Sequence, residues 1–142
     1  MNAIFLTFWG KKYSDDFLKL FLPCFAENLK NIKRDKKNFT LEIWTLLKDK
    51  NYIKKNSLFK KVNKKIKCNF KNIDFIINEG KINNMSKYEL HETVSYIFKT
   101  SQYFKYQYFW FFYPDQFFSN KLILNVSNKT IKENADLVMM PS

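Results

Sequence analysis

The chain has 142 residues and a formal net charge of +12, from 25 basic and 13 acidic side chains. Hydrophobic residues make up 46% of the chain and aromatic residues 19%, which excludes an intrinsically disordered protein and is enough for a buried core. Only two glycines and three prolines occur, so no stretch resembles a linker. We therefore predict a single domain over residues 1–142.

The basic excess is almost entirely lysine, because Arg34 is the only arginine. Proteins that recognise phosphate or base edges favour the bidentate guanidinium group of arginine. Lysine accompanies abundant Asn, Ile and Phe here, a mixture typical of an A+T-rich genome. We therefore do not expect nucleic acid as a partner. We expect exposed lysines that are spread around the surface, namely Lys54, Lys55, Lys60, Lys61, Lys64 and Lys65.

Several other classes of site are excluded by spacing. Cys24 and Cys68 have no metal-ligand spacing, and we expect reduced thiols in a cytoplasmic protein. The chain shows no signal-peptide pattern and no apolar run of the roughly 20 residues that span a bilayer. The glycine patterns of dinucleotide-binding, P-loop and α/β-hydrolase proteins are also missing from the sequence.

The first elements are a strand and an amphipathic helix. Residues 3–9 form an apolar run that ends at Gly10, which predicts a buried strand and a turn. Ser14 is the expected N-cap of the helix, and Pro23 should kink or split it. The apolar residues that recur every four positions, and so predict its buried face, are Phe17, Phe21, Phe25 and Leu29.

Two more strands are predicted in the middle of the chain. Residues 39–46 are rich in aromatic and β-branched side chains and predict the second strand, followed by a polar turn at 48–51. Residues 52–67 carry a weak apolar stripe, which predicts a helix with a solvated basic face. Residues 70–77 predict the third strand, and a capping box at Ser86 predicts a helix over 87–104.

The most distinctive stretch is an aromatic run at 107–113, which stops at Pro114 and is followed by Asp115. A run this apolar predicts an interior strand that is covered on both faces. A partly helical segment from Ser119 and a fifth strand at 136–140 complete the alternation. This order predicts the α/β class, as a three-layer α/β/α fold with a mainly parallel, roughly five-stranded Rossmann-like sheet.

In such sheets ligands bind outside the carboxyl ends of the strands, where Asp115 is expected. This carboxylate could contact a metal, a donor diphosphate or a sugar hydroxyl; the alternative is a plain turn residue after proline. His91 is the only histidine and could donate to a phosphate or act as a base. The alternative for His91, which we favour, is an ordinary helix-surface or half-buried side chain.

Five motifs in chain order resemble bacterial glycosyltransferase-like proteins with the nucleotide-diphospho-sugar transferase (GT-A) fold. They are the turn Trp9-Gly10-Lys11-Lys12-Tyr13, the helical Leu22-Pro23-Cys24-Phe25, Thr45 at the end of the second strand, Tyr88 with His91, and Pro114-Asp115 with Ser119. The usual metal motif of that family is D-x-D, whereas only Asp115 is present here. The chain also stops before an acceptor-binding half, so it looks like the amino-terminal part of a longer protein or a truncated gene product.

The resemblance implies an enzyme that transfers a sugar from a nucleotide-sugar to an unknown acceptor. It implies donor contacts at Thr7, Trp9, Gly10 and Thr45, with Asp115 and His91 as the catalytic candidates. Asp115 would hold Mg²⁺ or Mn²⁺ only when the nucleotide supplies further oxygen ligands. Added positive charge could come from Lys11, Lys12 and Lys48. The competing hypothesis is a non-catalytic basic α/β module that binds a protein partner or a polyanion.

Overall fold

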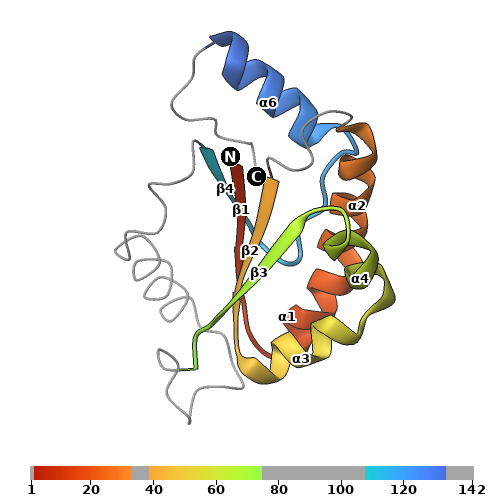
Figure 1. Ribbon diagram of the computed structural model, residues 1–142, viewed down its shortest axis with the longest axis vertical. Helices are drawn as coiled ribbons and strands as arrows, with labels where there is room; N and C mark the ends of the chain where they lie inside the picture. The colour runs from red at the N-terminus through yellow and green to blue at the C-terminus, as the bar shows by residue number, and fades with distance from the viewer. Residues whose placement is uncertain (1, 33–38, 75–107, 134–142) are drawn as a thin grey trace.

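The computed structural model describes residues 2–32, 39–74 and 108–133. They form an α/β fold with one four-stranded sheet in the order β3-β2-β1-β4 (Figure 1). The strands are β1 (Asn2–Thr7), β2 (Phe39–Thr45), β3 (Lys67–Asn72) and β4 (Tyr108–Phe112). All three strand pairs are parallel, as the alternation of strands and helices predicted.

The third strand lies earlier than predicted. We expected residues 70–77, but β3 begins at Lys67, opposite Thr40, and ends at Asn72. The apolar residues after it biased the prediction toward the later range. Ile73 is indeed fully buried, and its N–H donates to the carbonyl of Thr45 at 3.2 Å just beyond the strand.

The aromatic strand β4 borders the described part of the sheet, where it pairs with β1 alone. Phe112 is buried, but Phe111 and Tyr113 are 38% and 54% exposed, so the expected cover on both faces is wrong at this end. The fifth strand predicted at 136–140 lies outside the described residues. The interior position that it would give to β4 stays a prediction.

The first helical segment is α1 (Lys11–Asp16), a π-helical turn η1 (Phe17–Phe21) and α2 (Leu22–Asn31). Pro23 was predicted to kink or split this helix, but the segment is helical without a break from Lys11 to Asn31. The π-helical turn lies directly before the first turn of α2, which holds the proline and needs no N–H from it within α2. The predicted N-cap Ser14 is wrong, because it lies inside α1 and is fully buried. Gly10 is the actual N-cap residue.

The predicted turn at 48–51 and the single helix at 52–67 are also wrong. The structure has α3 (Leu47–Lys55) and α4 (Ser57–Asn63) instead. Asn56 separates them, and its Oδ1 accepts the N–H of Phe59 at 3.0 Å, which makes it the N-cap of α4.

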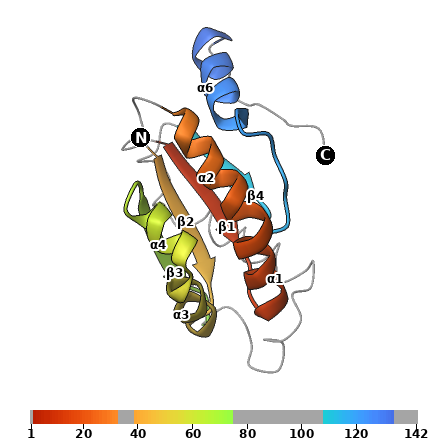
Figure 2. The same ribbon diagram turned by 90° about the vertical axis from the view of Figure 1, so that its right-hand side faces the viewer.

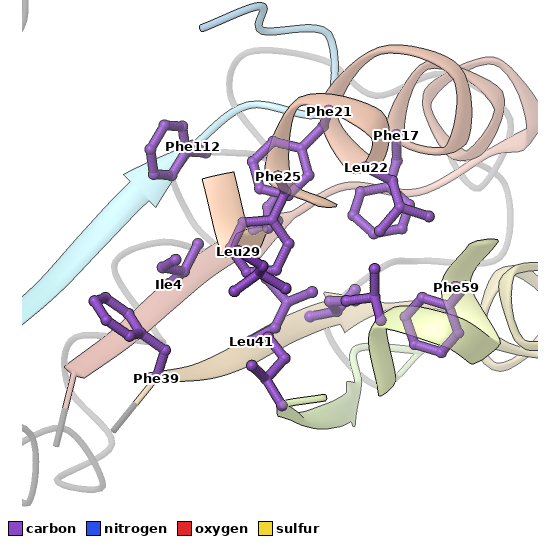
Figure 3. Close-up of a cluster of buried hydrophobic side chains, with 14 of the residues drawn as sticks. Ile4, Phe17, Phe21, Leu22, Phe25, Leu29, Phe39, Leu41, Phe59 and Phe112 are labelled. Carbon is purple, nitrogen blue, oxygen red and sulfur yellow. The ribbon is translucent and has the colours of Figure 1, made fainter. Parts of the chain in front are cut away.

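Helices α1 to α4 all lie on one side of the sheet (Figures 1 and 2). A ladder of stacked rings joins η1 and α2 to Phe8, just after β1: Phe8 to Phe17 at 5.2 Å, Phe17 to Phe21 at 5.6 Å, and Phe21 to Phe25 at 5.6 Å between ring centroids. Phe21 also meets the edge of Phe112 on β4 at 5.5 Å (Figure 3). The predicted four-residue periodicity therefore marks the true core face of this segment.

The last described helix, α6 (Leu122–Glu133), is held to α2 by a buried asparagine. Asn28 donates to the carbonyl of Ser119 at 2.8 Å and accepts the N–H of Ile123 at 3.1 Å. Ile123 is fully buried in the same core as the stacked rings. The partly helical segment predicted after Ser119 is thus confirmed, whereas the helix predicted over 87–104 lies outside the described residues.

In the described ranges, no helix is both long and apolar enough to cross a membrane. The two central strands are buried along most of their length, on the helix-covered face and on the opposite face alike.

We expect Phe21→Ala to lower the free energy of unfolding by about 3–5 kcal/mol, because a large cavity would open among four aromatic neighbours. The matched control is Phe117→Ala, since Phe117 is 73% exposed and should change stability by less than about 0.5 kcal/mol. Urea unfolding followed by circular dichroism measures both. Similar losses for the two variants would show that the ring ladder is not the core.

Candidate functional site at the carboxyl edge of the sheet

The carboxyl ends of all four strands lie along one edge of the sheet, because every strand pair is parallel. Thr7 lies opposite Trp44, and Thr45 lies opposite Asn72. The strand register therefore brings the predicted residues Thr7, Thr45 and Asp115 to this edge, along with Trp9 and Gly10. His91 lies outside the described residues.

The predicted donor contacts are mostly enclosed. Thr7 is buried, and its hydroxyl donates to the carbonyl of Trp44 at 3.4 Å. Trp9 and Thr45 are each 1% exposed. In the described part of the chain, the Trp9 Nε1 and Thr45 Oγ1 atoms are buried without a hydrogen-bond partner. These two groups could bind a ligand only if the residues that enclose them move.

Gly10 has a specific conformational role at this edge. Its φ of 89° lies in the left-handed region that disfavours side chains, whereas a Cβ atom added there would meet nothing within 4 Å. The glycine is thus explained by backbone conformation at the start of α1. The close backbone approach expected from the sequence is not what requires it within the described structure.

Asp49 is a buried acid that the sequence analysis missed. Its Oδ2 accepts the N–H of Gly10 at 2.8 Å, so a carboxylate from α3 occupies the amino end of α1. Unpaired N–H groups and the helix dipole make such an end a natural anion site. Here the protein's own carboxylate already fills it. Nothing in the local Lys-Asp-Lys-Asn sequence reveals this partner, which lies 39 residues away.

The amino end of α3 is filled in the same way. The N–H of Leu47 donates to Oδ2 of Asp74 at 3.0 Å, and the N–H of Asp74 in turn donates to Oδ1 of Asn72 at 2.8 Å. Asp74 is exposed, so this cap is open to solvent while the cap made by Asp49 is buried. This long-range cap explains why α3 begins where the sequence predicted a polar turn.

Asp115 lies in a turn beyond β4, and its carboxylate is exposed. The N–H of Gln116 donates to the carbonyl of Tyr113 at 3.3 Å, and the Gln116 side chain accepts the N–H of Tyr113 at 2.8 Å. Pro114 is buried, and its ring restricts the backbone φ angle within this turn. Among the residues that the structure describes, the Asp115 carboxylate makes no hydrogen bond or ion pair.

Two exposed aromatic residues lie close to Asp115 in the sequence, two positions before it and two positions after it. Tyr113 is 54% exposed and Phe117 is 73% exposed. Single exposed apolar residues are normal on a protein surface, so these rings are of interest because of their position beside an exposed acid beyond the carboxyl end of β4. Asp115, Tyr113 and Phe117 are therefore exposed groups after β4 that a ligand could reach.

A second polar group at the edge links α1 to α3. Lys11 Nζ lies 3.1 Å from Asp15 Oδ2 and 3.2 Å from Tyr52 Oη, and Tyr52 donates to Asp15 Oδ1 at 2.6 Å. The hydrogen bond from Tyr52, followed by that from Lys11, holds the pKa of Asp15 below its usual value. The bonds to Tyr52 and then Asp15 raise the pKa of Lys11. These mutual contacts leave the group with little free charge.

A further buried acid lies inside the sheet. Glu42 on β2 is 4% exposed and accepts a hydrogen bond from Asn69 on β3 at 2.7 Å. Its signal was present in the sequence, because burying an acid within the otherwise apolar run FTLEIWT costs free energy unless the acid is paired.

The thiol of Cys68, on β3, has a perturbed pKa. Burial, followed by the negative charge of Glu42, raises the pKa of Cys68 to about 12.

No three His, Cys, Asp or Glu side chains gather closely enough to hold a metal ion within the described ranges. Comparison with known protein families, with curated proteins and with solved structures finds no match for this chain. The resemblance to GT-A glycosyltransferases therefore rests on the five quoted motifs.

Replacing Asp49 tests the internal cap of α1. We expect Asp49→Ala to destabilise the protein by about 1–3 kcal/mol, because it leaves the N–H of Gly10 without its acceptor. Asp49→Asn keeps an acceptor oxygen and should cost less. Thermal unfolding of both variants gives the comparison, and an unchanged melting temperature for Asp49→Ala would mean that water replaces the cap without loss.

The raised pKa of Cys68 predicts an unreactive thiol. At pH 8 about one molecule in ten thousand carries the thiolate, the nucleophilic form, if the pKa is about 12. Iodoacetamide should therefore leave Cys68 unmodified in the folded protein and alkylate it in denaturant, where its pKa returns to about 8.5. Peptide mass spectrometry distinguishes Cys68 from Cys24. Rapid labelling of folded Cys68 would contradict the burial that raises its pKa.

Proposed function

We propose that this chain is the nucleotide-sugar-binding part of a glycosyltransferase-like enzyme, with Asp115 at the donor site. The observation that supports the proposal most directly is the exposed carboxylate of Asp115, beyond the carboxyl end of a parallel strand, which has no partner among the described residues and lies two positions from Tyr113 and from Phe117, both exposed. The five motifs that resemble the GT-A family support the same assignment.

The topology favours this position over the rest of the edge. The chain runs from β1 outward to β2 and β3, and then returns to place β4 on the other side of β1. Ligands of open α/β sheets bind where the strand order reverses in this way. That point lies between β1 and β4, next to the turn that carries Asp115.

The flanking rings suit the chemistry of a nucleotide-sugar. A nucleobase can stack on the face of Tyr113 or Phe117, and such stacking contributes about 1–3 kcal/mol per base. A sugar presents C–H groups to such a ring and hydroxyl groups to a carboxylate. Asp115 can thus accept hydroxyl hydrogen bonds, or share Mg²⁺ or Mn²⁺ with the donor diphosphate.

The diphosphate needs a source of positive charge other than the helix ends. The amino ends of α1 and α3 are already occupied by Asp49 and Asp74. Lys12 and Lys48 are exposed close to the starts of these helices, whereas Lys11 is tied to Asp15 and Tyr52. We infer that Lys12 and Lys48 would balance the charge of the leaving diphosphate and that His91 would assist as a donor or base. Mg²⁺ or Mn²⁺, held by Asp115 together with the donor's own oxygens, would supply further positive charge.

We also propose the parts of the expected fold that lie beyond the described four-stranded sheet. They are a third layer on the second face of the sheet and a fifth strand at 136–140. The proposal further includes contacts from Thr7, Trp9, Gly10 and Thr45 once the donor rearranges the edge. It also places the enzyme in the cytoplasm.

The decisive experiment measures binding of nucleotide-sugars by calorimetry, with and without Mn²⁺, for the native chain and for Asp115→Asn. We expect Mn²⁺ to bind only in the presence of donor, and Asp115→Asn to weaken donor binding about tenfold or more, which corresponds to about 1.4 kcal/mol. The fold should be unaffected, because the residue is exposed and its side chain makes no described contact.

The matched control is Glu27→Gln, which removes an equally exposed carboxylate from α2, where its only described ion pair is with Lys30. This variant should bind donor normally. Equal donor affinity in the native chain and in Asp115→Asn would remove Asp115 from the site. Failure of a broad set of nucleotide-sugars to raise the melting temperature of the native chain would overturn the proposed function.

A further inference from the structure

The positive charge of this protein is concentrated in one short part of the chain. Residues 50–73 contain no acid and nine lysines, which are Lys50, Lys54, Lys55, Lys60, Lys61, Lys64, Lys65, Lys67 and Lys71. Taking these from the 25 basic residues leaves 16, against 13 acids elsewhere. The other 118 positions therefore carry a net charge of only +3, whereas these 24 positions carry +9.

This distribution does not fit the expected compositional bias, which would raise lysine along the whole chain. The six lysines that we expected to be exposed are all exposed, as predicted. They do not spread around the surface, however, but occupy the end of α3, the outer face of α4 and the turn that leads into β3. We call this surface the α4 lysine surface.

The α4 lysine surface forms because the opposite side of the helix is apolar. Phe59, Val62 and Ile66 are buried against the sheet. Lys60 and Lys61 are exposed on α4, Lys64 is its C-cap residue four positions after Lys60, and Lys65 follows in the turn. Side chains four residues apart in a helix are neighbours, and like charges at this spacing repel each other by about 0.2–0.5 kcal/mol per pair.

The described structure does not compensate this repulsion with acids. Its ion pairs join Lys11 to Asp15 and Lys30 to Glu27, and none includes a lysine of residues 50–73. The carboxyl ends of α3 and α4 favour some cations in their last turns, which accounts for part of the cluster. It does not account for Lys65 and Lys67, which lie beyond the last turn of α4.

We propose that the α4 lysine surface binds the phosphate backbone of nucleic acid without reading its sequence. Lysine is a point charge that suits phosphate neutralisation, whereas base recognition favours the arginine fork, which this surface lacks entirely. An anionic membrane fits less well. Helices that lie on membranes insert apolar side chains, but Phe59 and Val62 of α4 face the core.

The position of the surface separates it from the proposed donor site. Lys67 lies opposite Thr40 near the start of β2, so Lys64, Lys65 and Lys67 lie toward the amino edge of the sheet. Asp115 lies beyond the carboxyl end of β4. Nucleic-acid binding therefore does not depend on the proposed transferase function, and either can fail without the other.

The test measures fluorescence anisotropy of labelled duplex DNA and single-stranded RNA, each of about 20 nucleotides per strand, between about 50 and 200 mM salt. The test variant changes Lys61, Lys64 and Lys65 to Gln. The control variant changes Lys19, Lys30 and Lys121 to Gln, which are exposed and lie on other elements, so the loss of net charge is the same. Melting curves confirm that both variants fold.

We expect the native chain to bind both nucleic acids with affinity that falls steeply as salt rises. The test variant should lose about tenfold in affinity and reduce the magnitude of the salt slope by about 2–3, because three phosphate contacts are removed. The control variant should stay within about twofold of the native chain. Equal losses in the two variants, or no binding at about 50 mM salt, would overturn the proposal. Binding to phosphatidylserine vesicles, with none to DNA or RNA, would overturn it in favour of a membrane.

Discussion

The parallel pairing of β1 with strands on both of its sides is the constraint on which the rest of the structure depends. β1 bonds to β2 from Asn2 to Thr7 and to β4 from Asn2 to Leu6, and it is buried on both faces from Ala3 onward. Polar backbone groups inside a core must be paired, so β1 is stable only when both neighbours are in place. Parallel neighbours require long crossovers, and the helices of the first crossover carry the stacked aromatic rings that cover this strand.

The carboxyl edge that results from this pairing is electrostatically quieter than its topology suggests. Two helices begin there, and each could attract an anion through its free N–H groups. Each is capped instead by an acid from later in the chain. Asp49 of α3 caps α1, and Asp74, just after β3, caps α3. The caps tie neighbouring crossover units to each other. Asp115 is an exposed acid beside the reversal of strand order that has no partner among the described residues.

Sequence periodicity was sufficient for features that depend on local burial and failed for features that depend on distant partners. The spacing of Phe17, Phe21 and Phe25 identified the core face of the first helix, because burial repeats with the helical period. The start of α3 was missed because its cap comes from Asp74, 27 residues further along the chain. The N-cap at Ser14 was wrong for a similar reason, since Asp49 stabilises an earlier start.

The candidate site was predictable only in outline. The position of Asp115 followed from the aromatic run and the rule for parallel sheets, and the structure does bring the residues after β1, β2 and β4 to one edge. Composition alone could not predict which acids accept hydrogen bonds inside the protein. Glu42, Asp49 and Asp74 each accept a hydrogen bond from a residue far away in sequence, so one oxygen of each carboxylate is engaged within the fold. The lysines of α4 have no such partners in the described structure. Acids near the sheet thus serve in capping and pairing, while the exposed lysines around α4 form a local excess of positive charge at the surface.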